Sequence, residues 1–234
     1  MSEPAVVIND LTHEYTEGTV ALSNVSLTVE KGESVGVIGH NGSGKSTLFM
    51  SIVGINSPHG HVVIDGIPVI EKNLRDVRRK IGYVFHDARD QLFMSSVIED
   101  VAFGPLNMGL SREEALHRSE HALEMVGLAG FGDRISYHLS GGEMRRTAIA
   151  SVLAMSPGII VMDEPSAGLD PRAKRELISV IRSLDCTKII ASHDLDFIRS
   201  IVDRVVLLEQ GKVVGDGPTG EIIDNTELLL AHGL

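Results

Sequence analysis

Short apolar runs, separated by polar turns, alternate with amphipathic stretches along most of the chain. Four runs are apolar and rich in β-branched residues, which is typical of strands buried inside a parallel sheet. They are residues 34–38, 81–85, 159–162 and 188–191. Further runs also predict strands, and two hairpin turns, Asp65-Gly66 and Gln210-Gly211, lie beside them. These runs cover residues 5–11, 25–29, 61–64, 204–208 and 212–215.

Helical signals lie between these runs. One helix is predicted over residues 46–53, where Gly54 ends it. Another is predicted over residues 171–184, because Asp170 is a favourable N-cap residue and Pro171 suits the first helical position.

Residues from about 87 to 156 differ from their surroundings, because this segment is mostly helical. Ser111 and Glu114 have the spacing of a capping box, as do Ser140 and Glu143, which open a helix that ends near residue 155. We therefore predict one α/β domain with an inserted helical subdomain. Its parts are a core of about residues 1–86 and 157–217, the helical insertion of about residues 87–156, and a short amphipathic tail of residues 218–234.

Composition and charge narrow the possible functions. The 234 residues, 43% of them hydrophobic and 23% charged, can bury a full core and do not indicate disorder. The formal net charge of −11 argues against broad nucleic-acid binding, which needs a cationic surface. Two basic clusters, at residues 75–80 and 145–146, are either contact sites or solvated helix faces. The second interpretation is preferred for the first cluster.

Cysteine usage and the start of the chain bear on location. Cys186 is the one cysteine, so no disulfide framework or thiolate metal site is expected, which agrees with a reducing cytosol. The first ten residues lack the basic start and long apolar stretch of a signal peptide. No window approaches the roughly 18 apolar residues that span a bilayer. We expect a chain that does not cross a membrane by itself.

The segment with the clearest chemistry is Gly39-His40-Asn41-Gly42-Ser43-Gly44-Lys45-Ser46-Thr47, which fits the phosphate-loop pattern G-x-x-x-x-G-K-[ST]. A predicted strand precedes it and a predicted helix follows it, so backbone N–H groups and a helix N-terminus point at one anion. Lys45 would bring a charge to the β- and γ-phosphates, and Ser46 a hydroxyl to Mg²⁺. An ordinary glycine-rich turn is the alternative, but the flanking elements favour binding of a nucleoside triphosphate.

Two adjacent carboxylates, Asp163 and Glu164, follow the apolar run at residues 159–162. Side chains alternate along a strand, so these two point to different sides. One can hold Mg²⁺ through water while the other faces a hydrolytic water as general base. Such a pair is weak evidence alone, but it is strong evidence downstream of a phosphate loop.

Three further positions gain meaning from the phosphate loop. Tyr15, in the turn at residues 15–18, either covers a sheet edge or stacks on a purine ring. His193 follows the run at residues 188–191, where a histidine is usually structural but here can contact a γ-phosphate and orient water. Ser140 opens a helix whose exposed, glycine-rich start can bind an anion.

Together these motifs resemble the ATP-binding proteins of ABC transporters, over essentially the whole chain. Leu139–Glu143 matches the signature that separates this family from other phosphate-loop enzymes. The resemblance implies a RecA-like α/β core with an N-terminal antiparallel β-subdomain and an inserted helical subdomain. It also implies a head-to-tail dimer of two ATPase copies or paralogues. ATP and Mg²⁺ would then lie between the Lys45 loop of one copy and the signature residues Ser140, Gly141, Gly142 and Glu143 of the other.

The resemblance also implies roles for matching residues. Tyr15 corresponds to the aromatic residue that stacks on the base, and Asp163, with Ser46, to the Mg²⁺ ligands. Glu164 corresponds to the general base and His193 to the switch histidine. Asp170 corresponds to the residue that couples the two sites across the dimer.

Two positions depart from the family's usual pattern. His86 stands where a glutamine usually starts the loop into the helical insertion, which bears on how Mg²⁺ and the attacking water are sensed. Gln91 is too far along the chain to be the obvious substitute. Glu143 stands where the signature commonly ends in glutamine, which is a mild change.

Residues 90–93 and 99–107 resemble the energy-coupling factor branch, most closely its cobalt and nickel uptake ATPases. The branch implies that the chain powers the uptake of cobalt, nickel or another micronutrient, as a peripheral protein at the cytoplasmic face of the cell membrane. Its partners there would be a polytopic membrane coupling subunit and a separate substrate-binding membrane subunit, with no nucleic acid. We expect Leu92, Phe93 and Met94 to anchor the coupling subunit, and Val101 and Phe103 to pack inside the helical insertion.

Two other functions share some of these features. A soluble single-cassette ABC ATPase of an assembly pathway, such as iron–sulfur assembly, would have every nucleotide motif, and only residues 90–107 argue against it. Direct metal binding by His59 with His61, or by His117 with His121, is less favoured. Paired surface histidines without carboxylate or cysteine partners are usually solvated.

Overall fold

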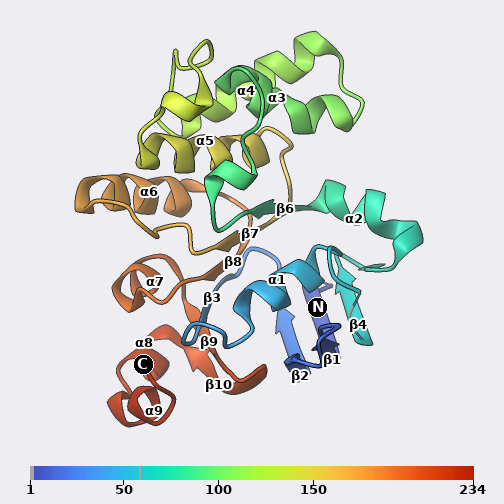
Figure 1. Cartoon of the computed structure of the whole chain (residues 1–234), viewed down its shortest axis with the longest axis vertical. Helices are drawn as coiled ribbons and strands as arrows, with labels where there is room; N and C mark the ends of the chain where they lie inside the picture. The colour runs from blue at the N-terminus through green and yellow to red at the C-terminus, as the bar shows by residue number, and fades with distance from the viewer. Residues whose placement is uncertain (1–2, 58) are drawn as a thin grey trace.

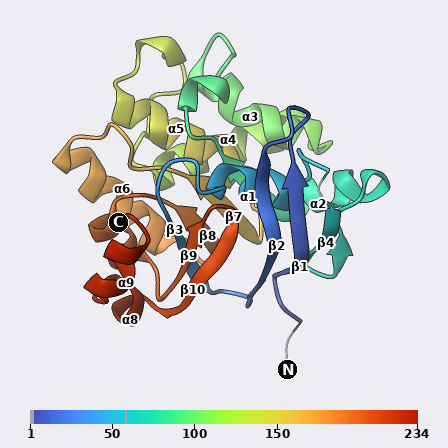
Figure 2. The same ribbon diagram turned by 60° about the horizontal axis from the view of Figure 1, so that its bottom comes forward.

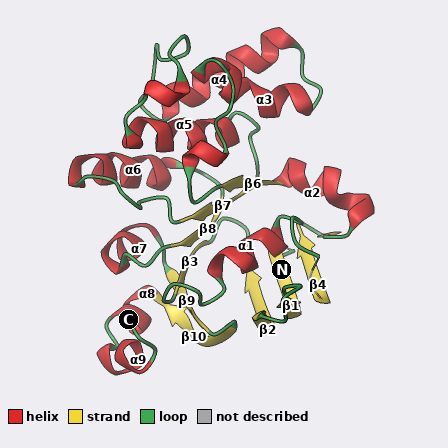
Figure 3. Cartoon of the chain, in the orientation of Figure 1, coloured by secondary structure: helices red, strands yellow, loops and turns green. Residues whose placement is uncertain are grey.

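The computed structural model describes residues 3–57 and 59–234, so residues 1, 2 and 58 of the predicted core lie outside the described residues. Within this part of the chain, two sheets are joined to a layer of helices (Figures 1 and 3). The smaller sheet is antiparallel and has the strand order β2-β1-β4-β5. Its strands are β1 (Val6–Glu14), β2 (Val20–Val29), β4 (His59–Ile64) and β5 (Ile67–Pro68).

The larger sheet has the strand order β10-β9-β3-β8-β7-β6. Its strands are β3 (Ser34–Ile38), β6 (Ile81–Val84), β7 (Ile159–Asp163), β8 (Thr187–Ala191), β9 (Arg204–Glu209) and β10 (Lys212–Pro218). All neighbours run parallel except β10, which is antiparallel to β9. The segments that follow β3, β6, β7 and β8 therefore emerge at one edge of the sheet, where ligands bind in open parallel sheets.

Helices cover both faces of the larger sheet and extend beyond it (Figure 1). The core helices are α1 (Lys45–Ile52), α2 (Leu74–Lys80), α6 (Pro171–Ser183) and α7 (Leu195–Ile201). The inserted layer contains α3 (Val97–Asn107), α4 (Arg112–Met125) and α5 (Gly141–Leu153). Short 3₁₀ turns are η1 (Glu71–Asn73), η2 (Ala88–Asp90) and η3 (Ser136–His138).

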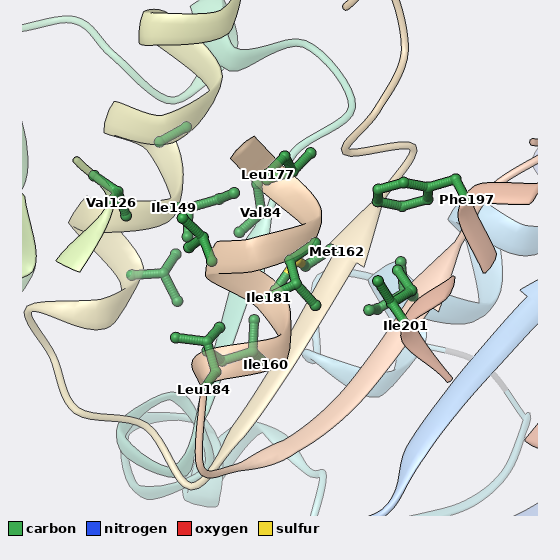
Figure 4. Close-up of a cluster of buried hydrophobic side chains, with 14 of the residues drawn as sticks. Val84, Val126, Ile149, Ile160, Met162, Leu177, Ile181, Leu184, Phe197 and Ile201 are labelled. Carbon is green, nitrogen blue, oxygen red and sulfur yellow. The ribbon is translucent and has the colours of Figure 1, made fainter. Parts of the chain in front are cut away.

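Two hydrophobic clusters hold these layers together. In one, Leu48 and Phe49 of α1 are buried between the two sheets. In the other, α5 and α6 pack with β7, and Figure 4 shows Ile149, Leu177 and Met162 gathered there. Because α5 shares this cluster with α6, the inserted helices form a continuous apolar core with the sheet.

The C-terminal segment packs on the core as α8 (Thr219–Ile223) and α9 (Thr226–Ala231), beside β10 (Figure 2). Ile222 and Leu229 are buried there. At the end of the segment, the His232 Nδ1 atom lies 2.7 Å from a carboxylate oxygen of Glu209, the last residue of β9. No helix in the described part of the chain is long and apolar enough to span a membrane.

The predicted strand boundaries were too short in the smaller sheet. Strand β2 begins at Val20 rather than at residue 25, and β4 begins at His59 rather than at residue 61. The reason is that β1 continues to Glu14, which pairs with Val20, while Thr12 pairs with His59. Main-chain pairing thus continues through polar residues, which lack the hydrophobic pattern that predicts a strand.

The two predicted capping boxes differ in outcome. The one at Ser140 and Glu143 is complete, with side-chain and backbone bonds in both directions. The one at Ser111 is half formed, because its hydroxyl accepts the Glu114 N–H but the Glu114 carboxylate binds Arg118 instead, at 2.7 Å.

Candidate functional site

The phosphate loop joins β3 to α1 and is held closely by neighbouring backbone. A Cβ atom on Gly39 would lie 2.2 Å from the carbonyl oxygen of Leu208, and one on Gly44 would lie 2.6 Å from that of Ala21. Such contacts exclude a side chain at either position, so glycine is required there. The Gly211 N–H, in the turn between β9 and β10, donates to the Ser43 carbonyl at 2.9 Å.

Lys45 is the first residue of α1 and is buried despite its charge. Its ammonium group donates to the carbonyl oxygens of Gly39, at 2.7 Å, and His40, at 3.1 Å. Burial lowers the pKa of Lys45, while the carboxylates of Glu164 and Asp163 act in the opposite direction. The cation therefore lies inside the loop and close to the two predicted carboxylates, with Ser46 exposed beside it.

Asp163 ends β7 and has an exposed fraction of only 1%. Its Oδ2 atom accepts a long bond from the Tyr83 hydroxyl, at 3.4 Å, and its Oδ1 atom has no hydrogen-bond partner among the described residues. A buried carboxylate oxygen needs a partner, and a hydrated cation is one. The residues present therefore fit Mg²⁺, which is usually bound by one or two protein groups together with phosphates and water.

Glu164 follows Asp163 in a left-handed backbone conformation, with φ of 47°, and its N–H donates to Ala191 O. Residues other than glycine seldom adopt this conformation, which outside turns is a mark of a functionally constrained backbone. The Glu164 carboxylate accepts hydrogen bonds from the Ser192 hydroxyl at 3.1 Å and the His193 N–H at 3.1 Å, and it lies 2.9 Å from His193 Nδ1. The predicted base and the predicted switch are thus in direct contact.

Ser192 is a site residue that the sequence prediction missed. It is fully buried after β8, and its hydroxyl also accepts the Asp194 N–H, at 3.1 Å. Its position directly before His193 was the one indication in the sequence, and a serine at a strand end is too common to predict a site residue.

Tyr15 lies beside the phosphate loop. Its hydroxyl is 2.9 Å from Thr47 Oγ1, and its ring meets the His13 ring edge-on with the centroids 4.8 Å apart. Tyr15 is 37% exposed, so part of the residue is accessible to a ligand.

The signature residues and Asp170 form a second group. The Asp170 carboxylate caps α6 by accepting the N–H groups of Arg172 and Ala173, at 2.8 and 3.0 Å. A Cβ atom on Gly142 would lie 3.0 Å from that of Ala173, so the starts of α5 and α6 are in close contact. Both line an open cavity of about 880 Å³ to which the phosphate loop contributes no residue. Within one copy of the chain, the predicted site residues therefore lie in two places.

Glu143 belongs to this second group and acts within its own helix. Its carboxylate accepts the N–H of Ser140 at 2.8 Å and the hydroxyl of Ser140 at 2.7 Å. These bonds hold the pKa of Glu143 below its usual range. The carboxylate that replaces the usual glutamine thus caps α5.

His86 follows β6 by two residues, and its side chain is exposed at the sheet edge that also carries the phosphate loop. Gln91 does not replace it. The Gln91 side chain accepts the Phe85 N–H at 3.1 Å and donates to Ala148 O at 2.7 Å and Ser151 Oγ at 2.9 Å. Both the oxygen and the nitrogen of the Gln91 amide therefore form hydrogen bonds within the protein.

A groove of about 780 Å³ lies between α2, α3 and α5. The prediction for its residues was partly wrong, because Leu92 is buried and Phe103 is 41% exposed. Phe103 follows the buried Val101 by two residues, so the helical turn points it away from the core. It lines the groove together with Phe93, which is 55% exposed and meets it edge-on at 5.0 Å.

Within the part of the chain that the structure describes, the paired histidines lack the further ligands that a metal site needs. Among the described residues, no group of three or more histidine, cysteine, aspartate or glutamate side chains is placed to hold a metal ion. This observation gives the direct metal-binding alternative no support.

Comparisons with known proteins point to one family. The sequence pattern of the family described as ABC transporter matches residues 22–167, which is more than half of the chain. The energy-coupling factor transporter ATP-binding protein EcfA of Methanothermobacter thermautotrophicus is 44% identical, over 96% of this chain and 74% of its own.

Solved structures agree with this result. CbiO1 of Clostridium perfringens, described as part of the ABC transporter complex CbiONQ, has a TM-score of 0.86 and 35% identity, covering 98% of this chain and 94% of its own. The ATP-binding cassette MJ0796, solved as a dimer bound to ADP and phosphate, has a TM-score of 0.84 and 30% identity, covering 92% of this chain and 98% of its own.

Proposed function

Since the chain belongs to the ABC transporter family of ATP-binding proteins, we propose that it powers an energy-coupling factor transporter for cobalt or nickel ions. Membership of the family establishes the coarser statement, that the chain is an ATP-binding and ATP-hydrolysing transporter subunit. The finer proposal is supported by the likeness to EcfA and to CbiO1.

The proposed chemistry uses the residues at the edge of the larger sheet. Lys45 and the phosphate loop would hold the β- and γ-phosphates, and Tyr15 would stack on the adenine. Ser46 and Asp163 would hold Mg²⁺, which neutralises developing charge on the phosphates. Glu164 would accept a proton from the attacking water, and His193 would keep that carboxylate oriented, because Nδ1 and the backbone N–H of His193 both contact it.

The proposed active unit is a dimer. The separation of the phosphate loop from the cavity lined by Ser140 and Asp170 supports this proposal, because neither group alone surrounds a nucleotide. A second copy or a paralogue would bring its signature residues to the first copy's loop.

The observation that carries the transport proposal is the groove around Phe93 and Phe103. Asp100 fixes its geometry, because its carboxylate accepts the N–H groups of Phe93 and Met94, at 2.8 and 2.9 Å, and the Ser136 hydroxyl. Two exposed aromatic rings on a rigid backbone are typical anchors for an amphipathic helix. We infer that cytoplasmic helices of a polytopic coupling subunit bind here, with the ATPase at the cytoplasmic face of the membrane.

Phe93→Asp tests this inference. We expect the variant to lose co-purification with the coupling subunit and ATP-driven uptake of cobalt or nickel into membrane vesicles, because a charge would have to be buried in an apolar contact. ATP binding should be unchanged. Leu230→Asp is the matched control, since Leu230 is 70% exposed on α9 and lies outside the groove.

Two results would contradict the proposal. If Phe93→Asp still assembles and transports normally, the groove is not the binding surface. If the wild-type protein is recovered only with soluble scaffold proteins, the assembly-pathway function is correct instead.

A separate prediction concerns His86, which stands where the family usually has a glutamine and lies at the sheet edge that carries the phosphate loop. If its side chain takes the place of that glutamine, we expect His86→Ala to lower kcat of ATP hydrolysis and His86→Gln to retain it. His117→Ala, at an exposed position on α4, is the control. An unchanged kcat in His86→Ala would rule out this role.

A further inference from the structure

Arg145 of α5 is a buried cation that the proposed chemistry does not use. Its exposed fraction is 7%, yet no carboxylate oxygen of the described residues lies within 4.0 Å of its guanidinium. Burying a charge is costly, and buried arginines are usually paired. An unpaired one at this position calls for a specific contact.

That contact is made with the loop that carries His86. The Arg145 Nη1 atom donates to the carbonyl oxygen of Phe85 at 2.9 Å. The backbone N–H of Phe85 donates to Gln91 Oε1. Gln91 in turn donates to Ala148 O and Ser151 Oγ of α5. Both backbone polar groups of Phe85 are therefore fixed to α5, directly or through one side chain.

The contacts of Arg145 and Gln91 with Phe85 lie between the groove and the nucleotide site. Phe85 and Gln91 line the groove, and His86 directly follows Phe85 in the loop. Burial lowers the pKa of Arg145, and the carboxylates of Asp87, Asp163 and Glu164 partly offset this effect. The cation is thus within electrostatic range of the predicted Mg²⁺ ligand and general base.

We propose that Arg145 is a positioning residue for ATP hydrolysis, which holds the backbone at Phe85 and thereby sets the position of His86 relative to α5. Because α5 begins with the signature residues, the same helix then fixes the loop and the signature as one body. A movement of the residues that line the groove would then move the His86 loop and the signature residues together, through α5. The inference rests on ATP hydrolysis alone, so it does not depend on which ion is transported.

Two substitutions at one position separate the contact from simple packing. Arg145→Met keeps an unbranched side chain without a donor, whereas Arg145→Lys keeps a cation that can donate to Phe85 O. For Arg145→Met we expect kcat of ATP hydrolysis to fall about 10- to 100-fold, the usual loss when a group near the chemistry is misplaced. The KM for ATP should stay within about twofold, and Arg145→Lys should recover most of kcat.

Hydrogen exchange of the same full-length proteins provides a readout independent of activity. Amide exchange over residues 85–91 should accelerate in Arg145→Met and stay slow in Arg145→Lys. Gln91→Met, which removes the other hydrogen bond to Phe85, should accelerate exchange in the same segment. It is the test variant if Arg145→Met does not fold. Faster exchange with the expected loss of kcat supports the proposal.

Three outcomes would overturn it. They are an unchanged kcat in Arg145→Met, a rise in KM with no loss of kcat, and slow exchange over residues 85–91 in both methionine variants. The proposed transport is tested separately by Phe93→Asp and by the wild-type complex, so failure of one proposal is distinguishable from failure of the other.

Discussion

Replacing Glu164 with glutamine should slow ATP hydrolysis by about 10²–10⁴-fold, the usual cost of losing a positioned base, while ATP binding persists. The structure indicates that the fold tolerates this change. Glutamine can still accept the His193 N–H with its carbonyl oxygen, and the Ser192 hydroxyl can rotate to accept from the new amide group. Only the proton-accepting function is removed.

Single-turnover hydrolysis and nucleotide binding, measured on the same preparation, test this prediction. We also expect the uncleaved ATP to hold the dimer closed, which sedimentation would detect. Glu120→Gln, an exposed substitution of the same kind on α4, should behave as wild type. A Glu164→Gln protein with near wild-type turnover would exclude Glu164 as the base.

Lys45→Met should weaken ATP binding by about 2–5 kcal/mol, the cost of removing one partner of a buried charge pair, or roughly 30-fold to several thousandfold. In the structure, the ammonium group of Lys45 donates to two loop carbonyls. We expect phosphate oxygens to replace at least one of these contacts when ATP binds. Methionine matches the length of lysine but supplies neither charge nor donor.

The chain contains a matched control for this experiment. Lys188 is also buried and also donates to two backbone carbonyls, those of Leu184 and Cys186, but it lies on β8 away from the phosphate loop. Lys188→Met should therefore affect stability and leave ATP affinity nearly unchanged. Equal losses of affinity in both variants would show that the effect of Lys45→Met comes from the fold. Unchanged affinity in Lys45→Met would exclude its predicted role.

The parts of the fold that the sequence predicts correctly are those encoded locally. The runs that became β3, β6, β7 and β8 are mostly apolar, and nearly all of their residues are buried within the sheet. The phosphate loop is contiguous, so its residues and their order are visible without any knowledge of tertiary contacts. Family resemblance then supplied the arrangement of the two sheets and the helical insertion, which the comparisons confirmed.

The errors concern positions whose structure is decided by pairing or packing partners and not by their own hydrophobic pattern. Nothing near Val20 indicates a strand, because its pairing partner is Glu14 across a turn. Phe103 was expected inside, since an aromatic residue within an apolar helix is usually buried. The contact of Arg145 with Phe85 spans 60 residues, so no spacing rule could have suggested it.

The strand order of the larger sheet has a consequence for synthesis on the ribosome. Strand β3, which carries the phosphate loop, is hydrogen-bonded on one side to β8 and on the other to β9. Strand β8 begins about 150 residues after β3 and β9 about 170 residues after it, so the nascent chain carries an unpaired β3 for most of its synthesis. Until β8 and β9 have been made, both edges of β3 lack their native partners, and unpaired strand edges are the surfaces through which chains associate wrongly.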